Sequence, residues 1–167
     1  NYGTWGNGSS AHLFGELLAQ QSGTQLIHAA YKSEAAAHND LFGELLDFAW
    51  ANPSTARAQV QGGKMKVLGV AGTRRVSTLP QISTFSEQGF KGFDLDSWIG
   101  MYAPANLPTE LQNTWVTALR EITAMPDVQA KLISFGFEPL GNTPQQFMEV
   151  FKADYPRVSE LIKAAGV

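Results

Sequence analysis

The sequence has no cysteine among its 167 residues. This absence excludes disulfide bonds and metal sites built from thiolates. Charge is also scarce, because Asp, Glu, Lys and Arg together make up only 16% of the residues and the net charge is −3. No run of basic residues occurs, which argues against a nucleic-acid-binding surface. No apolar stretch approaches the ~20 residues that a membrane-spanning helix needs.

The residues that are present fit a globular protein. With 44% hydrophobic residues, a chain of this length can form one domain or two small lobes with a real core. The chain starts at Asn1 without a methionine or a recognisable signal peptide. We therefore interpret it as a mature or truncated segment whose targeting sequence would lie outside it.

A glycine-rich stretch from Tyr2 to Leu13 is the most informative part of the sequence. Its three glycines allow a sharp turn and a close approach of backbone to a ligand. Asn7 or Ser9 can cap the helix that follows, whose first N–H groups have no partner inside the helix. These N–H groups and the helix dipole together predict a binding site for a carboxylate or phosphate. The alternative is a capped helix start that binds nothing.

Strand and helix patterns alternate over the first 71 residues. Short apolar runs predict buried strands over 1–3, 25–30, 45–50 and 66–71, and helical spacing predicts helices over 9–21, 34–43 and 53–61. Such alternation is typical of an α/β fold with a parallel-type αβα sheet. Ligands of these sheets bind at the carboxyl ends of the strands, where the glycine-rich stretch lies.

The second half of the sequence is mainly helical. Alternation predicts a strand over 93–103 and a short one over 137–140, and T-x-x-Q at 143–146 predicts a helix start. A kink is expected at Pro156. Apolar residues with helical spacing form stripes at Leu111, Trp115, Leu119, Ile122, Phe147, Phe151, Val158, Leu161 and Ile162.

Several short motifs follow one another in a specific order. They are Tyr2-Gly3-Thr4, Gly6-x-Gly8-Ser9, His12-Leu13, Ala30-Tyr31-Lys32, Leu79-Pro80, Glu87-Gln88-Gly89, Ser97-Trp98-x-Gly100 and Thr143-Pro144. In this order and spacing the chain resembles the Bug family (TctC-like receptors), the periplasmic solute-binding proteins of tripartite tricarboxylate transporters. The resemblance covers nearly the whole chain but lacks the N-terminal part of the family's first lobe.

The resemblance implies a fold, a function and a location. It implies a periplasmic-binding-protein (Venus-flytrap) fold, with a ligand-binding α/β lobe in residues 1–100, the second lobe of the family. Residues 101–167 would be the C-terminal helical part of the incomplete first lobe. The implied function is recognition of a small organic carboxylate in the periplasm and its delivery to membrane transporter subunits, with no enzymatic activity, no cofactor and no nucleic-acid partner.

Local chemistry and the resemblance together give nine candidate ligand-binding residues. Hydroxyl and amide side chains of the glycine-rich stretch add hydrogen bonds to the backbone donors, and the tyrosine has a donor tip on an apolar body. For His12 a structural hydrogen bond, for Asn52 a turn start and for Trp98 packing between lobes are the alternatives. The nine are Thr4, Gly6, Asn7, Gly8, Ser9, His12, Tyr31, Asn52 and Trp98.

Among the departures of this sequence from the family pattern, one introduces a charge. Ser33-Glu34 stands where the family usually has Gly-Ser. A carboxylate at this position is expected to repel an anionic ligand.

A dinucleotide-binding enzyme domain is the alternative function. Gly6-x-Gly8-x-x-Ala11 satisfies the G-x-G-x-x-A fingerprint. However, the second strand should then end in an acidic residue for the ribose, and it ends instead at Ala30-Tyr31-Lys32. The three histidines match no metal-binding spacing and no nucleophile elbow occurs, so we expect neither catalytic nor metal-ligating residues.

The apolar stripes of the second half also predict a partner. In the family they would pack on the sheet of the first lobe, whose early strands are absent here. Leaving many large side chains in water would cost roughly 1.5–3 kcal/mol for each. We therefore expect a homodimer formed through the C-terminal helices.

Overall fold

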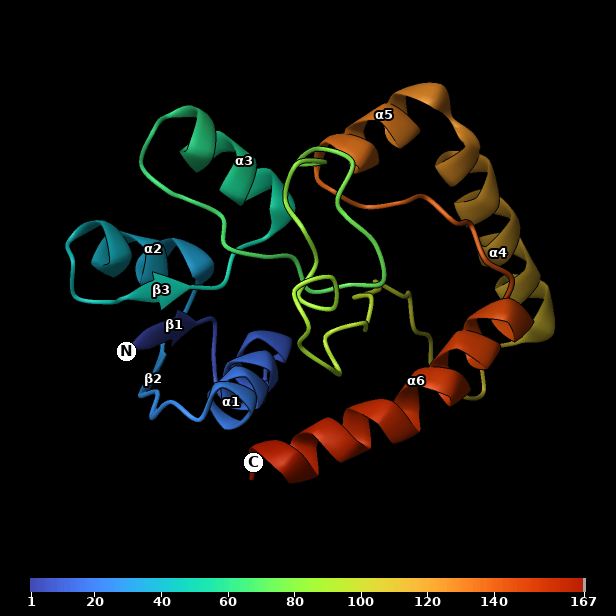
Figure 1. Ribbon diagram of the computed structural model, residues 1–167. Helices are drawn as coiled ribbons and strands as arrows, with labels where there is room; N and C mark the ends of the chain where they lie inside the picture. The colour runs from blue at the N-terminus through green and yellow to red at the C-terminus, as the bar shows by residue number, and fades with distance from the viewer. Residues whose placement is uncertain (167) are drawn as a thin grey trace. The chain divides into compact units, whose positions relative to one another are not determined.

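The computed structural model describes residues 1–166, which form two compact units. Unit 1 consists of residues 1–96 and the stretch from Pro156 onward, and unit 2 consists of residues 97–155. The elements are numbered in Figure 1. They are β1 (Tyr2–Thr4), α1 (Ser10–Ser22), β2 (His28–Ala30), α2 (Glu34–Phe42), β3 (Phe48–Ala49), α3 (Pro53–Gln61), α4 (Thr109–Ala124), α5 (Pro126–Ser134) and α6 (Pro144–Ala165).

Unit 1 contains a parallel sheet with the strand order β2-β1-β3. Tyr2 of β1 is in register with His28 of β2 on one side and with Phe48 of β3 on the other. Helices α1 and α2 both contact β1 (Figure 1). This architecture confirms the predicted α/β fold with a parallel sheet. Because all three strands run the same way, the loops that follow them leave from one edge of the sheet.

Local signals explain where the helices of unit 1 begin and end. Ser9 caps α1 with its side chain, and Gly23 ends that helix in the left-handed conformation at φ +66°. Ser33 caps α2 in the same way as Ser9. Pro53 begins α3, where its missing N–H costs no hydrogen bond. The helices predicted over 9–21, 34–43 and 53–61 are therefore confirmed.

The core of unit 1 is an aromatic cluster between α1 and the segment that leads to residue 95. Its buried members are Phe14, Leu17, Phe85, Phe93 and Leu95. Val158 and Leu161 of α6 pack against the cluster. Two residues of the predicted apolar stripes are therefore covered within the chain.

Three predicted strands are wrong. Residues 66–71 make only one isolated bridge, from Val70 to Thr84, and Leu68 is 66% exposed. Residues 93–103 and 137–140 contain no strand in the described chain. Phe93 and Leu95 are buried by packing into the aromatic cluster, so their apolar character reflects side-chain burial without a neighbouring strand.

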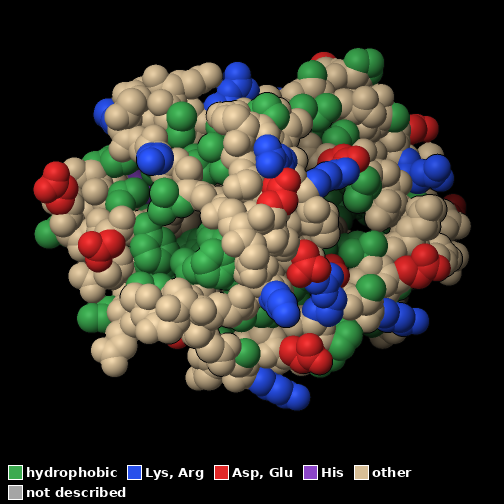
Figure 2. Space-filling view, in the orientation of Figure 1, with side chains coloured by type: hydrophobic (Ala, Val, Ile, Leu, Met, Phe, Trp, Pro, Cys, Tyr) green, Lys and Arg blue, Asp and Glu red, His purple; other side chains and the backbone are tan. Residues whose placement is uncertain are grey.

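Unit 2 contains α4, α5 and the first part of α6. The predicted capping box starts α6, because the Thr143 N–H donates to Gln146 Oε1 at 2.9 Å and the Gln146 N–H donates to Thr143 Oγ1 at 3.2 Å. Pro156 lies inside α6. None of the described residues of α4, α5 or α6 is buried. Figure 2 shows that hydrophobic side chains reach the surface of the molecule in several places.

No helix within residues 1–166 combines the length and the apolar character needed to cross a membrane.

Candidate functional site

The glycine-rich loop connects β1 to α1 at the carboxyl edge of the sheet. Gly6 has φ +132° and Gly8 has φ +71°, which glycine adopts without a steric penalty. Ser9 fixes the end of the loop, since its Oγ accepts from the His12 N–H at 3.3 Å and donates to the Gly6 carbonyl at 2.7 Å. The loop is thus a rigid turn that opens directly into a helix.

Some N–H groups of this loop are already bonded within it. The Gly6 N–H donates to Thr4 Oγ1 at 3.3 Å, and the Gly8 N–H donates to His12 Nδ1 at 3.1 Å. The Ser9 N–H donates to the Gly6 carbonyl at 3.4 Å. Over residues 1–166, the N–H groups of Asn7 and Ser10 have no acceptor, and both residues are exposed. The donors available to an anion are therefore fewer than the sequence predicts.

Two stacked histidines support the loop from inside unit 1. The rings of His12 and His28 lie 3.9 Å apart at 17°, and His28 Nε2 lies 2.6 Å from Thr4 Oγ1. Tyr2 stacks on His28 at 5.1 Å, and its hydroxyl donates to Glu16 Oε1 at 2.7 Å. Tyr2 and Thr4 are fully buried. Thr4 and His12 therefore hold the loop in place, and the sequence analysis missed His28 as their partner.

This packing changes the pKa of two groups. Burial, together with the hydrogen bond to Glu16, raises the pKa of the Tyr2 phenol. Burial and the neighbouring His12 ring lower the pKa of His28 below its ordinary value of about 6.5.

The lowered pKa of His28 predicts a loss of stability in acid. Between its two pKa values the unfolded chain binds more protons at this position than the folded chain does, so folding weakens as the pH falls below about 6.5. The loss ends once the pH is below the folded-state pKa. NMR titration of the His28 ring should give a pKa below 6.5, and unfolding followed from pH 7.5 to 5 should show a smaller slope in H28Q. A normal pKa for His28 would contradict the prediction.

Tyr31 and Asn52 follow the two neighbouring strands at the same edge. The Tyr31 hydroxyl donates to Asp40 Oδ2 at 2.7 Å, and this hydrogen bond raises the pKa of Tyr31. The Asn52 N–H donates to Glu34 Oε1 at 3.0 Å, and its side-chain amide donates to Glu34 Oε2. The sequence analysis identified the Glu34 carboxylate as a departure from the family but missed its contact with Asn52.

Trp98 belongs to unit 2, whereas the other eight predicted site residues belong to unit 1. Its indole N–H donates to Asp154 Oδ2 at 3.0 Å, and its ring meets Phe147 edge-on at 4.9 Å. These contacts give Trp98 a packing role within unit 2.

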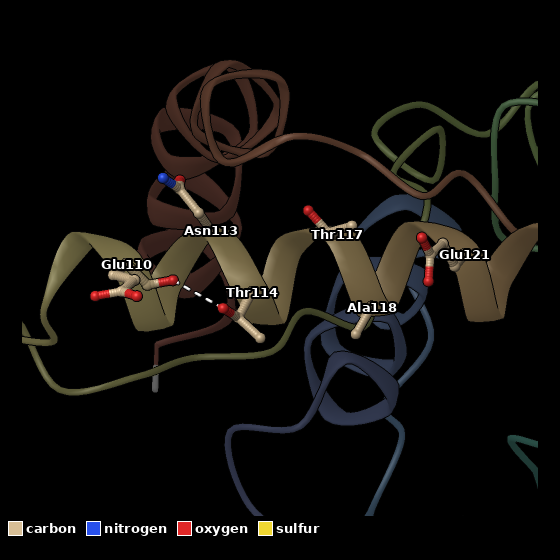
Figure 3. Close-up of a pocket in the computed structure, with 6 residues that line it drawn as sticks. All are labelled: Glu110, Asn113, Thr114, Thr117, Ala118 and Glu121. Carbon is tan, nitrogen blue, oxygen red and sulfur yellow. Dashed lines mark hydrogen bonds between the residues drawn. The ribbon is translucent and has the colours of Figure 1, made fainter.

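A pocket of about 520 Å³ lies along α4 (Figure 3). All of its lining residues come from this one helix, and two of them are carboxylates. A single helix face with two negative charges lacks the convergent donors that an anion needs. The lining residues are Glu110, Asn113, Thr114, Thr117, Ala118 and Glu121.

A parallel sheet with a glycine-rich loop and a helix start at its carboxyl edge is typical of α/β domains that bind ligands at this edge. Similarity to solved structures assigns this one to the periplasmic-binding-protein class. The periplasmic binding protein BugD matches with a TM-score of 0.84 and 33% identity, over 99% of this chain and 56% of that one. R. palustris Rpa4515, solved with adipate, matches with a TM-score of 0.88 and 27% identity, over 99% of this chain and 55% of that one.

The family follows from the sequence itself. The model of the tripartite tricarboxylate transporter family receptor (TctC) matches residues 1–167, so the chain belongs to this family of non-enzymatic solute-binding receptors. It is 29% identical to the UPF0065 protein in the TAR-I ttuE-ttuC' intergenic region of Agrobacterium vitis, over 99% of this chain and 49% of that protein. The chain spans about half the length of this relative and of the two solved structures. Membership confirms the resemblance, and the dinucleotide-enzyme alternative is wrong.

Proposed function

We propose that this chain forms the ligand-binding lobe of a periplasmic receptor for a small organic carboxylate, which it delivers to the membrane subunits of a tripartite tricarboxylate transporter. The observation that supports this proposal most directly is the Gly6–Ser10 loop, in which the exposed residues Asn7 and Ser10 have N–H groups without an acceptor in the described chain. A relative solved with adipate supports a carboxylate as the ligand class.

Recognition at this site needs no covalent bond to be made or broken. The N–H groups of Asn7 and Ser10 replace water around one carboxylate, and the amino end of α1 adds the positive end of its dipole. Ser9, Thr4 and His12 keep the loop in the shape that presents these donors. Tyr31 and Asn52 border the same edge and contact the rest of the ligand.

The proposal also assigns the remaining residues. Residues 1–100 form the second lobe of the receptor, and residues 101–167 belong to its first lobe, except that the end of α6, with Val158 and Leu161, packs on the core of unit 1. We keep Trp98 among the candidate ligand-binding residues, beside the packing contacts that it makes within unit 2.

Titration of the ¹⁵N-labelled chain with sodium acetate tests the carboxylate site. We expect the amide signals of Asn7 and Ser10 to shift in a saturable way, with sodium chloride at equal ionic strength as the control. If no loop amide responds to acetate, the proposed site is wrong.

Removing the Ser9 hydroxyl should weaken both folding and binding. Ser9→Ala should cost about 1 kcal/mol of stability, because α1 loses its cap. It should also weaken acetate binding by about 1 kcal/mol, because the loop that presents the Asn7 and Ser10 donors loses a hydrogen bond that fixes its shape. Thr143→Ala, which removes the cap of α6, should cost similar stability and leave the Asn7 response unchanged. Equal affinities in Ser9→Ala and the parent would leave Ser9 with a capping role alone.

We propose that a second copy of the chain covers the apolar stripe of α4, in a two-fold homodimer. Leu111, Trp115 and Ile122 are 50%, 56% and 45% exposed, and such a contiguous apolar surface is typical of an interface. Light scattering at micromolar concentration should give twice the mass of the chain. Trp115→Glu should give monomers, whereas Thr117→Glu, on the polar face lining the α4 pocket, should not. A monomeric parent would contradict the proposal.

A further inference from the structure

A carboxylate of the chain itself occupies one side of the candidate site. Glu34, the first residue of α2, accepts the Asn52 backbone N–H at 3.0 Å with Oε1 and the Asn52 side-chain amide with Oε2. Asn52 is the residue before the first turn of α3, and its side chain makes no capping bond to that helix. The Glu34 carboxylate thus takes both donors at this helix start, in the way an anionic ligand would.

Glu34 is held firmly in this position. Its side chain is only 15% exposed, and its Oε1 lies 3.9 Å from Nε2 of the buried His38. The same Nε2 lies 3.2 Å from the Trp50 carbonyl, so the ring joins the start of α2 to the end of β3. A carboxylate held by two donors beside a buried ring cannot swing away without leaving both Asn52 donors without their partner in the chain.

The Glu34–Asn52 pair and the glycine-rich loop share one edge of the sheet. The Tyr31 N–H donates to the Thr4 carbonyl at 2.9 Å, and the Trp50 N–H donates to the Gly3 carbonyl at 3.2 Å. The ends of β2 and β3 therefore flank the end of β1, where the loop begins. In the proposed site, a ligand with one end at Asn7 and Ser10 extends its other end along this edge.

We infer that Glu34 is a specificity-determining residue, which makes the site select a ligand with one carboxylate against a ligand with two. This inference rests on the proposed function. A second carboxylate would approach the negative charge of Glu34 in a partly desolvated site, where like charges repel strongly. It would also find the donors of Asn52 already occupied. A neutral or donor-bearing end meets neither obstacle, since a carboxylate that accepts two hydrogen bonds has further acceptor capacity.

Hexanoate and adipate are a matched pair of probes, because they share a six-carbon chain and differ by one carboxylate. We expect NMR titration of the full chain, read at the Asn7 and Ser10 amides, to give a lower Kd for hexanoate. Glu34→Gln keeps the size of the side chain and an oxygen for Asn52 but removes the charge. It should lower the Kd of adipate about tenfold relative to that of hexanoate. Glu44 is an exposed acid beyond the other end of α2, so Glu44→Gln is the control. It should leave the ratio of the adipate Kd to the hexanoate Kd unchanged.

The outcomes separate this inference from the proposed function. If both acids bind at the loop with the same ratio of adipate Kd to hexanoate Kd in the parent and in Glu34→Gln, the proposed role of Glu34 is wrong. The proposed carboxylate site is then unaffected. A parent that binds adipate more tightly than hexanoate overturns the inference without any variant. If neither acid moves a loop amide in any of the proteins, the proposed function is wrong and the inference fails with it. Should Glu34→Gln fail to fold, Glu34→Ser provides the same loss of charge.

Discussion

Replacing Phe93 with alanine is expected to lower the free energy of unfolding by about 3–5 kcal/mol. Phe93 is fully buried and stacks on Phe85 at 4.6 Å and on Phe14 at 5.4 Å. It also meets Phe90 edge-on at 6.1 Å. The three neighbouring rings, one from α1 and two from the segment after residue 84, would lose contacts to a cavity that they cannot close without leaving one another.

Urea unfolding followed by circular dichroism measures this loss. A deficit of about 3–5 kcal/mol is a large part of the ~5–15 kcal/mol that stabilises an ordinary domain. Phe42→Ala removes the same atoms in unit 1, from a side chain that is 37% exposed, and should cost clearly less. Similar losses in the two variants would show that the aromatic cluster is not the stability centre of unit 1.

The consequences of Phe93→Ala should reach the candidate site. Phe14 lies on α1, whose first turn carries the Ser9 cap and the Ser10 donor. A loosened α1 presents these groups less precisely, so we expect weaker acetate responses at the loop even under conditions where the variant is folded.

Helices could be predicted from the sequence because their limits depend on nearby residues. Ser9 and Gly23 delimit α1, and Pro53 starts α3 at the residue that the sequence indicates. Each of these signals acts within a few residues of the helix end. Tertiary contacts did not overrule them in the described chain.

Strands and site contacts were harder to predict because they depend on residues far apart in the sequence. The run at 66–71 has the composition of a buried strand, but Val70 finds only a bridge to Thr84. The loop itself was predictable from its glycines. Its support by His28 was not, because that contact requires the register of β1 with β2.

The Glu34–Asn52 contact shows the same limit within the candidate site. Both residues were singled out separately in the sequence, one as a departure from the family and one as a ligand-binding candidate. They are 18 positions apart, and only the parallel arrangement of the strands brings the starts of α2 and α3 together. The chemistry of each residue could be read from the sequence, but their pairing could not.

Gly15→Ala is expected to cost about 3 kcal/mol of stability, although alanine is normally the better residue inside a helix. Propensity alone would favour alanine by roughly 0.5–1 kcal/mol. A Cβ at this position, however, would lie 2.1 Å from Cε2 and 2.3 Å from Cζ of Tyr2. The Tyr2 ring cannot yield easily, because it is fully buried and stacks on Phe48 at 5.4 Å and on His28 at 5.1 Å. Overpacking of this kind costs about 1–3 kcal/mol and sometimes more, so the steric term exceeds the propensity gain.

A double-mutant cycle can assign this loss to the contact itself. Tyr2→Leu removes the atoms that the new methyl group would strike, so the double variant should lose less than the sum of the two single variants. Gly23→Ala is the matched control at a glycine with open space and φ +66°, where only the backbone penalty of about 1–2 kcal/mol applies. Additive losses would mean that α1 adjusts freely around Tyr2. Coupled losses, together with a weakened acetate response in Gly15→Ala, would show that close packing of α1 on β1 fixes the His28 ring and the loop above it.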